Sequence, residues 1–501
     1  MAISYINIPS NIRTPLFYAE FDNSMANTAT GTKKSLLIGQ MIEGGTAKEN
    51  APILVTSATK AKTLFGRGSP LALMVEAYKN TDSSGELWCV AQTVTGAAAT
   101  GTVSLKGTAI EAGTLSLYIG GTAVKVPVAA GATANDVATD LAAAVNADKD
   151  LPVSASSQSG SDSAYDVTLT AKGQGTYGND ILLALNRRGY VGGEESLNGI
   201  AVTITAMKNG TGDVDLEDAF ACLGDETYTF VGIPVSDATS LDAVKTEFND
   251  TTGRWAYNNM QYGHVFTAKR DTEENLVTFG KTRNDQHVTV FGVEPNNPEP
   301  CFIIAAAATA REAVYISADP ARPTQTGELI GLLETAIEDR FKRSVRETLL
   351  NKGIATLYVE GGYVRIERAI TTYQTNKFGD ADNSYLDSET LFTLAEIVTR
   401  LKTAVTSKYP RHKLADDGTR YGPGQAIVTP NVIRSELIAQ YAAMETAGLV
   451  ENADLFAKYL IVERNTSDPN RVDVLLPPDV VNQLRVFGML TQFRLQYSEN
   501  A

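Results

Sequence analysis

The chain has 501 residues, enough for about three domains at roughly 100–200 residues each. Apolar residues make up 43% and charged residues 20%, values typical of globular proteins, which excludes disordered and fibrous classes. The net charge of −15 repels phosphate backbones and argues against nucleic-acid binding through overall charge. No apolar run approaches the roughly 20 residues of a membrane span and no signal peptide is visible, so we expect no direct membrane insertion.

Cysteine and histidine are too few and too scattered for a disulfide framework or a metal centre. The three cysteines, Cys89, Cys222 and Cys301, each lie in an apolar stretch, so we expect buried free thiols packed as small hydrophobic residues. The three histidines form no pair at helical or turn spacing, which leaves little from which to build a zinc site. We therefore expect no metal site.

Residues 1–34 are predicted to form an N-terminal arm and linker. Ile6 and Ile8 alternate with polar residues, as do Phe17 and Phe21, and this period of two places each set on one face of a strand. Prolines interrupt the run, which suits an edge strand or an arm better than a central strand.

Short apolar strands alternate with helices in two stretches, 35–94 and 213–325. Strands are expected at 35–41, 86–92, 228–236, 264–269 and 287–294, and helices at 71–80 and 240–250. Strands that alternate with helices imply a parallel sheet covered on both faces. The sequence therefore predicts an α/β core with a mixed, mostly parallel sheet and flanking helices.

Residues 95–212 interrupt this core with a composition rich in Gly, Ala, Ser and Thr. Strands are expected at 102–107, 114–120, 123–129 and 166–171, with glycine-containing turns between them. A helix begins at Thr133, where Asp136 completes a capping box and apolar residues recur at every fourth position. We predict an inserted β-rich outer domain.

Residues 326–481 are predicted to form a C-terminal α+β domain. Its first helix is expected over 327–350, from an apolar stripe that ends before a glycine. A hairpin should turn at Gly361–Gly362, and two helices should follow at 388–407 and 431–447.

One glycine pattern raises the possibility of an enzyme. Gly173, Gly175 and Gly178 match the G-x-G-x-x-G of dinucleotide sites, so one alternative is a nucleotide-cofactor-dependent oxidoreductase. Such a site needs a buried parallel strand before the motif and a long helix after it. Here the preceding strand alternates and the following apolar segment is short, which favours a turn between strands. No catalytic serine or cysteine constellation is visible either, and we expect no enzyme and no cofactor.

Residues 482–501 are predicted to form a C-terminal arm with a long strand. The side chains that share its one face are Phe487, Met489, Thr491, Phe493, Leu495 and Tyr497. At about 3.3 Å per residue the strand spans roughly 36 Å, about twice a typical strand. It must pair with another strand, because unpaired backbone groups beside an apolar face are costly.

This strand can complete the chain's own sheet or join the sheet of a neighbour. Both ends of the chain have the pattern of strands, and Pro477–Pro478 stiffens the approach to the last one, which favours β-augmentation between copies. Head-to-tail donation of this kind generates rings or helical polymers. The other alternative is a monomeric binding module whose β-rich insert carries recognition.

The C-terminal part contains, in order, LLNKGIATLYV, ERAITTYQTNKFGDADNSYLD, KYPRHKLADDGTRYGPGQAIVTP, GLVENADLFAKYLIVERN and DPNRVDVLLPPDVVNQLRVFGMLTQFRLQY. These stretches, over 327–497, resemble the contractile tail sheath proteins of myophages, particularly the Mu-like group. The likeness is weaker over the core and weakest in the insert, where GTYGND resembles a turn of the family.

The resemblance implies a structural subunit. Sheath proteins of this family form hexameric rings that stack helically around an inner tube, and their contraction drives the tube through the host envelope. The implied partners are other copies of the chain, the tube protein, and baseplate and tail-terminator proteins. The implied location is the virion tail, after assembly in the host bacterial cytoplasm.

The resemblance also implies roles for residues. The family's arms join strands of neighbouring subunits, and the arm residues concerned are Ile6, Ile8, Phe17, Phe21, Phe487, Met489, Phe493, Leu495 and Tyr497. Part of the accepting sheet would come from Val472, Val474 and Leu476. Family members contact the tube through the C-terminal domain, where the cations Arg411, Lys413 and Arg434 can contribute.

Overall fold

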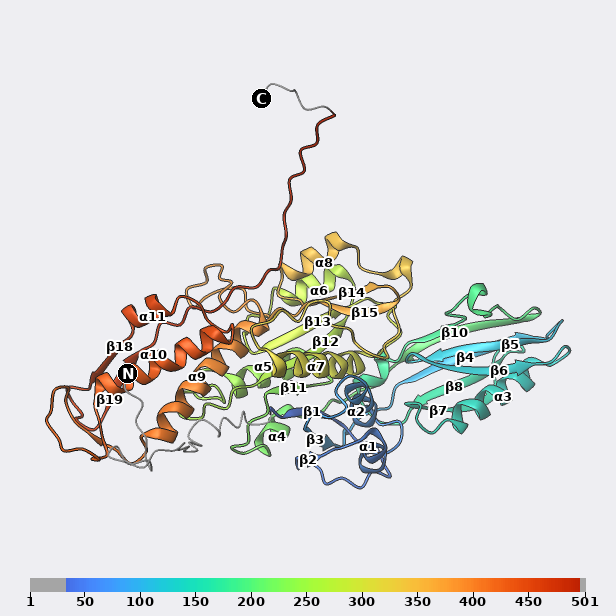
Figure 1. The fold of residues 1–501 in the computed structure, drawn as a ribbon. Coiled ribbons are helices and arrows are strands. Elements are labelled where there is room, and N and C mark those ends of the chain that lie inside the picture. Colours follow the sequence, from blue (N-terminus) through green and yellow to red (C-terminus); the bar gives the residue numbers. More distant parts are fainter. Residues whose placement is uncertain (1–32, 496–501) are drawn as a thin grey trace, which may run out of the picture.

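The computed structural model of the protein describes residues 33–495 (Figure 1). A central sheet with its helices forms the middle of an elongated body, with a β-rich unit at one end and a mostly helical unit at the other. The predicted arm residues Ile6, Ile8, Phe17, Phe21 and Tyr497 lie outside the described residues.

The central sheet has six strands in the order β13-β12-β11-β1-β3-β2. Neighbours from β13 to β3 run parallel, and only β2 is antiparallel to its partner. The bounds are β1 (Ser35–Gln40), β2 (Ile53–Leu54), β3 (Leu87–Gln92), β11 (Phe230–Gly232), β12 (His264–Arg270) and β13 (Val288–Val293). The predicted mixed, mostly parallel sheet is confirmed. β11 is shorter than expected, and it ends before Pro234, which has no N–H to donate to a ladder.

Helices cover both faces of this sheet, as the alternation of strand side chains requires. Leu37 packs in the core cluster that includes α1, α2 and α7, whereas Leu36 and Ile38 pack in the cluster that includes α4 and α5. The bounds are α1 (Ala58–Phe65), α2 (Pro70–Thr81), α4 (Leu216–Ala221), α5 (Ala238–Phe248), α6 (Glu273–Gly280) and α7 (Cys301–Ala318).

The long helix α7 lies at the centre of the fold. Its 18 residues have a mean hydropathy of 1.4, so by length and composition alone it could cross a membrane, but 72% of it is buried inside this structure. Ala305, Ala306, Ala307 and Ala308 are all fully buried. The apolar composition of α7 is therefore explained by its place in the core.

The β-rich unit has a core of its own, separate from that of the central sheet. It contains a four-stranded antiparallel sheet in the order β10-β4-β8-β7 and a three-stranded sheet in the order β6-β5-β9, with α3 packed against them. The bounds are β4 (Thr100–Gly107), β5 (Gly113–Ile119), β6 (Thr122–Val128), α3 (Ala134–Ala147), β7 (Val153–Ser159), β8 (Tyr165–Ala171), β9 (Leu183–Leu185) and β10 (Ile200–Lys208). The predicted capping box of Thr133 and Asp136 is present. The chain enters and leaves this unit side by side, because Ala97 and Thr211 form an antiparallel bridge.

The last third of the chain combines a hairpin with several helices. The hairpin of β14 and β15 turns at Gly361–Gly362, as predicted, and α9 and α10 lie within a residue or so of their predicted positions. The bounds are α8 (Arg343–Leu350), β14 (Thr356–Glu360), β15 (Tyr363–Arg368), α9 (Ser388–Lys408), β16 (Lys413–Leu414), β17 (Ile427–Val428), α10 (Pro430–Thr446), α11 (Ala453–Tyr459), β18 (Ile461–Arg464) and β19 (Val472–Leu475).

The predicted helix over 327–350 is wrong in its first two-thirds, residues 327–342. Only α8 is an α-helix, and the chain before it runs beside β15, where the Thr326 N–H donates to the Ile366 carbonyl at 2.8 Å and the Leu329 N–H to the Val364 carbonyl at 2.9 Å. Gly331 then takes a φ of +86°, which ends any regular run. Leu329 is buried through this pairing and not through a helical face.

All three cysteines are free thiols. Cys89 and Cys301 are buried, as expected, and burial raises the pKa of both thiols. Cys222 is only half-buried at the end of α4, so the expectation of a buried thiol is wrong for this residue.

Candidate subunit-linking site

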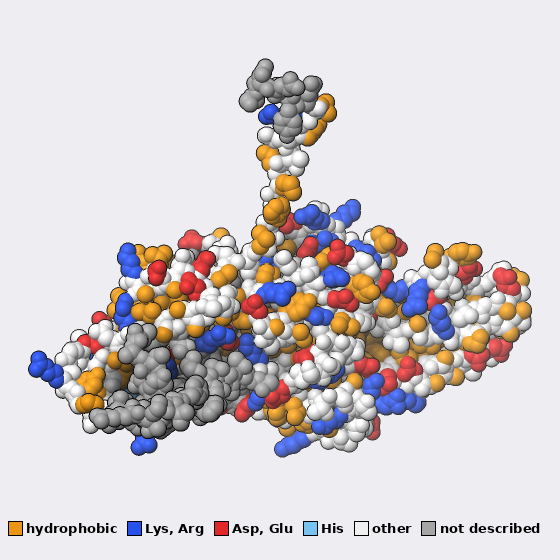
Figure 2. All heavy atoms as spheres, viewed as in Figure 1, with side chains coloured by type: hydrophobic (Ala, Val, Ile, Leu, Met, Phe, Trp, Pro, Cys, Tyr) orange, Lys and Arg blue, Asp and Glu red, His pale blue; other side chains and the backbone are white. Residues whose placement is uncertain are grey.

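The end of the described chain leaves the body as an extended segment, residues 486–495, which we call the projecting arm (Figure 1). Within residues 33–495 no strand pairs with it, so the predicted long strand is not formed inside one subunit. Figure 2 shows apolar side chains along its length. The exposed fractions are Val486 82%, Phe487 77%, Met489 75%, Leu490 86%, Phe493 80% and Leu495 97%. Of the predicted arm residues, all those that the structure describes are therefore exposed.

The segment before it, residues 479–485, is held against the body, and we call it the arm root. The Glu451 N–H donates to the Asp479 carbonyl at 2.9 Å, and the Val481 N–H donates to the Leu449 carbonyl at 3.3 Å. The Tyr441 hydroxyl accepts the Asp479 N–H at 2.9 Å. These bonds tie the first half of the arm root to α10 and to the chain between α10 and α11.

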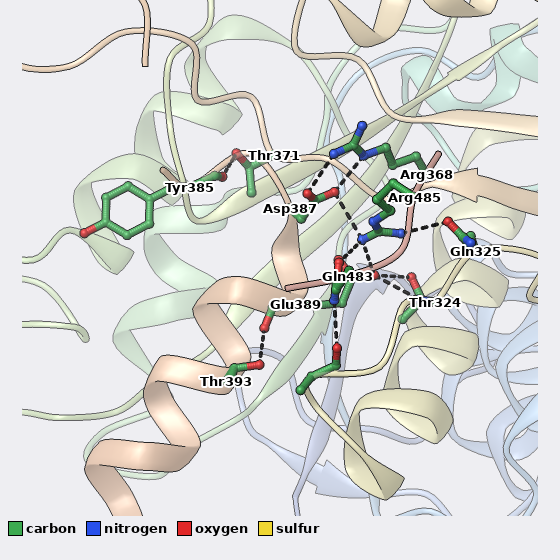
Figure 3. Close-up of polar contacts among 11 residues, drawn as sticks. Thr324, Gln325, Arg368, Thr371, Tyr385, Asp387, Glu389, Thr393, Gln483 and Arg485 are labelled. Atoms are coloured by element: carbon green, nitrogen blue, oxygen red, sulfur yellow. Dashed lines mark hydrogen bonds and ion pairs between the residues drawn. The ribbon is translucent and has the colours of Figure 1, made fainter. Parts of the chain in front are cut away.

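The second half of the arm root is held by side chains (Figure 3). Gln483 donates from Nε2 to the Ala321 carbonyl at 3.0 Å. Arg485 pairs through Nη2 with Glu389 Oε1 at 3.0 Å and with Asp387 Oδ1 at 3.2 Å, and it donates from Nη1 to Gln325 Oε1 at 3.3 Å. The backbone of the arm root alternates, so Gln483 and Arg485 face the body while Leu484 faces solvent.

The carboxylates under Arg485 lie at the start of α9 and on α7. The Glu389 side chain is fully buried, and its Oε1 also accepts the Thr324 N–H at 2.9 Å and the Thr324 hydroxyl at 3.0 Å. Glu312 on α7 is fully buried as well, and neither of its oxygens accepts a hydrogen bond within the described residues. Burial, and then the charge of Glu389, raises the pKa of the Glu312 carboxyl well above its ordinary value.

Asp387 has a second cation. Arg368 from β15 binds it with two parallel hydrogen bonds, from Nε and Nη2, both 2.8 Å long. These hydrogen bonds raise the pKa of the Arg368 guanidinium, which stays charged. Asp387 is therefore neutralised without Arg485, whereas Arg485 is the cation paired with Glu389 among residues 33–495.

The predicted accepting residues lie on the hairpin of β18 and β19. The two strands pair antiparallel, with Val462 opposite Val474 and Arg464 opposite Val472. Val474 is 42% exposed, and Leu476, just after the strand, packs partly buried against the cluster of α10 and α11. The described chain adds no third strand to this hairpin, so both of its outer edges have backbone groups available for pairing.

The three predicted tube-contact cations differ in their surroundings. Arg411 and Lys413 lie exposed in the segment between α9 and α10. Arg434 is half-buried on α10, and its guanidinium donates to the carbonyls of Ala457 and Leu460 at the end of α11. Arg434 thus stabilises the C-terminal end of a helix of its own subunit.

The glycine motif does not form a dinucleotide site. Gly175, at a φ of +129°, leads from β8 into the short 3₁₀ helix Thr176–Asp180 and not into an α-helix. The motif lines a cavity of about 250 Å³ at the ends of the parallel strands, where Asp180 pairs with Arg270 at 3.1 Å. The predicted turn is confirmed.

The residues that hold the arm root are not among those predicted from the sequence. Asn482, Gln483 and Arg485 interrupt an apolar run, but the sequence does not indicate that Gln483 and Arg485 face the body while Asn482 faces solvent. Their partners Asp387, Glu389 and Thr324 lie far away in the sequence, and no local pattern connects them.

Comparisons with known proteins identify the family of this chain. Residues 209–372 match the family "Phage tail sheath protein central domain", and residues 380–494 match the "Phage tail sheath C-terminal domain". The Mu-like prophage FluMu tail sheath protein of Haemophilus influenzae is 41% identical over 500 residues, which covers 99% of this chain and 100% of that protein.

Solved sheath structures are similar at lower identity. The sheath tail protein of Desulfitobacterium hafniense has 13% identity and a TM-score of 0.46, over 94% of this chain and 100% of that one. The helical sheath of the anti-feeding prophage in its contracted state has 10% identity and a TM-score of 0.44, over 97% and 100%. The chain belongs to the phage tail sheath family, as a structural sheath subunit of the Mu-like kind and not an enzyme.

Proposed function

We propose that this sheath subunit polymerises around an inner tube by exchanging strands with its neighbours, and that the polymer contracts to drive the tube through the host envelope. The projecting arm supports this most directly. It carries six apolar side chains that are 75% exposed or more, and such a segment is stable in water only when another surface covers it.

The hairpin of β18 and β19 is the acceptor that we propose for the arm of a neighbouring copy. Its outer edges supply the N–H and C=O groups that strand addition uses. Its exposed side chains Ile461 and Leu475 lie opposite each other in the hairpin and therefore share one face, which supplies apolar contacts for alternate residues of an incoming strand. Because strand pairing is directional and fixed in register, this link can persist while the contacts between subunit bodies change.

The remaining partners follow from the family. We propose hexameric rings stacked helically, with baseplate and tail-terminator proteins at the two ends. The predicted N-terminal arm, with Ile6, Ile8, Phe17 and Phe21, would supply the second connection between copies. Arg411 and Lys413 are the exposed cations that we assign to the tube surface, where complementary charge favours encounter.

Truncation of the chain after Arg485 tests the strand-exchange proposal. The shortened protein should stay folded, because the apolar side chains of residues 486–495 are at least 75% exposed, but electron microscopy should show particles of single subunits and no tubes. A matched control ends after Tyr497, which keeps every predicted apolar position and should still form tubes. Tubes formed by the shorter protein would refute the proposal.

A further inference from the structure

The arm root ends in polar side chains that bind the body, and the mostly apolar projecting arm follows directly. Gln483 and Arg485 reach into the body, while residues 486–495 project from it. The Arg485 side chain is only 10% exposed, in contrast to the apolar side chains that follow it. The boundary between the fixed and the projecting chain is therefore sharp and lies at one residue.

We propose that Arg485 is a latch: its ion pair with Glu389 holds the arm root on its own subunit. The chain through Arg485 then belongs to the subunit body, and only residues from Val486 onward pair with a neighbouring subunit. The role of the latch in assembly rests on the proposed strand exchange. The latch itself is a property of one subunit and can be tested without a polymer.

The charges explain why this latch holds. Glu389 is fully buried, and Arg485 is the cation that pairs with it among the described residues. If the arm root lifts, Glu389 is left in the interior beside Glu312, with only the hydrogen bonds of Thr324. An unpaired buried charge is strongly unfavourable, so most of the free energy needed to lift the arm root comes from breaking the pair between Arg485 and Glu389.

The surrounding charges do not provide a substitute. Asp387 keeps both of its oxygens on Arg368 when Arg485 leaves, so Arg368 has its own partner. Arg311 on α7 donates from Nε to the Glu328 carbonyl at 2.7 Å and lies over the ring of Tyr315. Neither cation pairs with Glu389 in this structure, and the latch therefore depends on Arg485.

Limited proteolysis with a broad-specificity protease, read by mass spectrometry, tests the latch. In the wild-type protein cleavage should fall within the projecting arm and leave a body that ends at or after Arg485. In Arg485→Met, cleavage should extend into residues 482–485, about 100-fold faster than in the wild type. This factor corresponds to ~3 kcal/mol for the loss of one partner of a buried pair.

A double variant separates the latch from a folding defect. In Arg485→Met with Glu389→Gln the buried site carries no unpaired charge, and the Gln carbonyl can still accept from Thr324. This protein should keep a melting temperature close to that of the wild type and still lose the protected boundary at Arg485. Arg67→Met is the matched control, because it removes an arginine from an exposed ion pair with Asp150, far from the arm root.

The outcomes are distinct. An unchanged boundary at Arg485 in the double variant would overturn the latch, whatever the state of assembly. If the truncation after Arg485 still forms tubes while the boundary moves in Arg485→Met, strand exchange by the arm fails and the latch stands. Loss of tubes in both the truncated protein and the double variant supports both proposals.

Discussion

Phe493 gives the sharpest test of how the projecting arm contributes to assembly. Its side chain is 80% exposed in the subunit, and full burial of a phenylalanine stabilises by about 1.5–3 kcal/mol. Phe493→Ala should therefore weaken each link between copies by about 10- to 100-fold, at 1.4 kcal/mol for each factor of ten. The stability of the isolated subunit should not change, because the exposed ring supports little of its own body.

The measurement is the critical concentration for tube formation, obtained by sedimentation over a series of protein concentrations. Phe493→Ala should raise it by the same factor. Gln492→Ala is the matched control, since it changes the adjacent side chain, which the alternation places on the opposite face of the strand. Equal critical concentrations for the two variants would refute the assignment of Phe493 to a buried face.

Two further predictions concern the subunit itself. Burial raises the pKa of the Glu299 carboxyl to about 7, whereas in the unfolded chain this group loses its proton near 4.5. The free energy of unfolding should therefore fall by about 3 kcal/mol as pH rises from 4.5 to 7. Glu299→Gln can still accept the Leu333 N–H, and it should remove this pH dependence from the melting temperature. Gly232→Ala would place its Cβ 2.6 Å from Leu37 Cδ2 and 2.7 Å from Thr309 Oγ1, so the free energy of unfolding in urea should decrease by about 1–3 kcal/mol. A wild-type melting temperature that does not change with pH would contradict the role of Glu299. A Gly232→Ala variant as stable as the wild type would contradict the predicted clash.

The elements with regular periodicity could be predicted from the sequence. α9 and the hairpin of β14 and β15 lie where the helical period and the Gly361–Gly362 turn place them. α7 was not predicted, because all of its faces are buried and no polar stripe interrupts the apolar residues. The opposite error was made before α8, where Leu329 fits a helical stripe but is buried by pairing with β15.

The linking site could be predicted only in part. The apolar alternation from Phe487 onward predicts a strand that needs a partner, and the apolar side chains of this alternation that the structure describes, through Leu495, are exposed. The anchor of that segment could not be predicted, since Arg485 meets Glu389 through tertiary contact and a lone arginine in an alternating run equally fits solvent exposure. The sequence pattern shows which apolar residues must be buried against a partner. Which residue fixes the arm root to the body depends on tertiary contacts, so it cannot be predicted from the pattern.

The bridge between Ala97 and Thr211 has a practical consequence. Because the chain enters and leaves the β-rich unit at adjacent points, a short loop can close the gap if that unit is removed. Because the unit is packed around its own core, a foreign module with neighbouring ends can be grafted there without cutting the central sheet. If the chain polymerises as proposed, every subunit of the polymer would carry one copy of the grafted module.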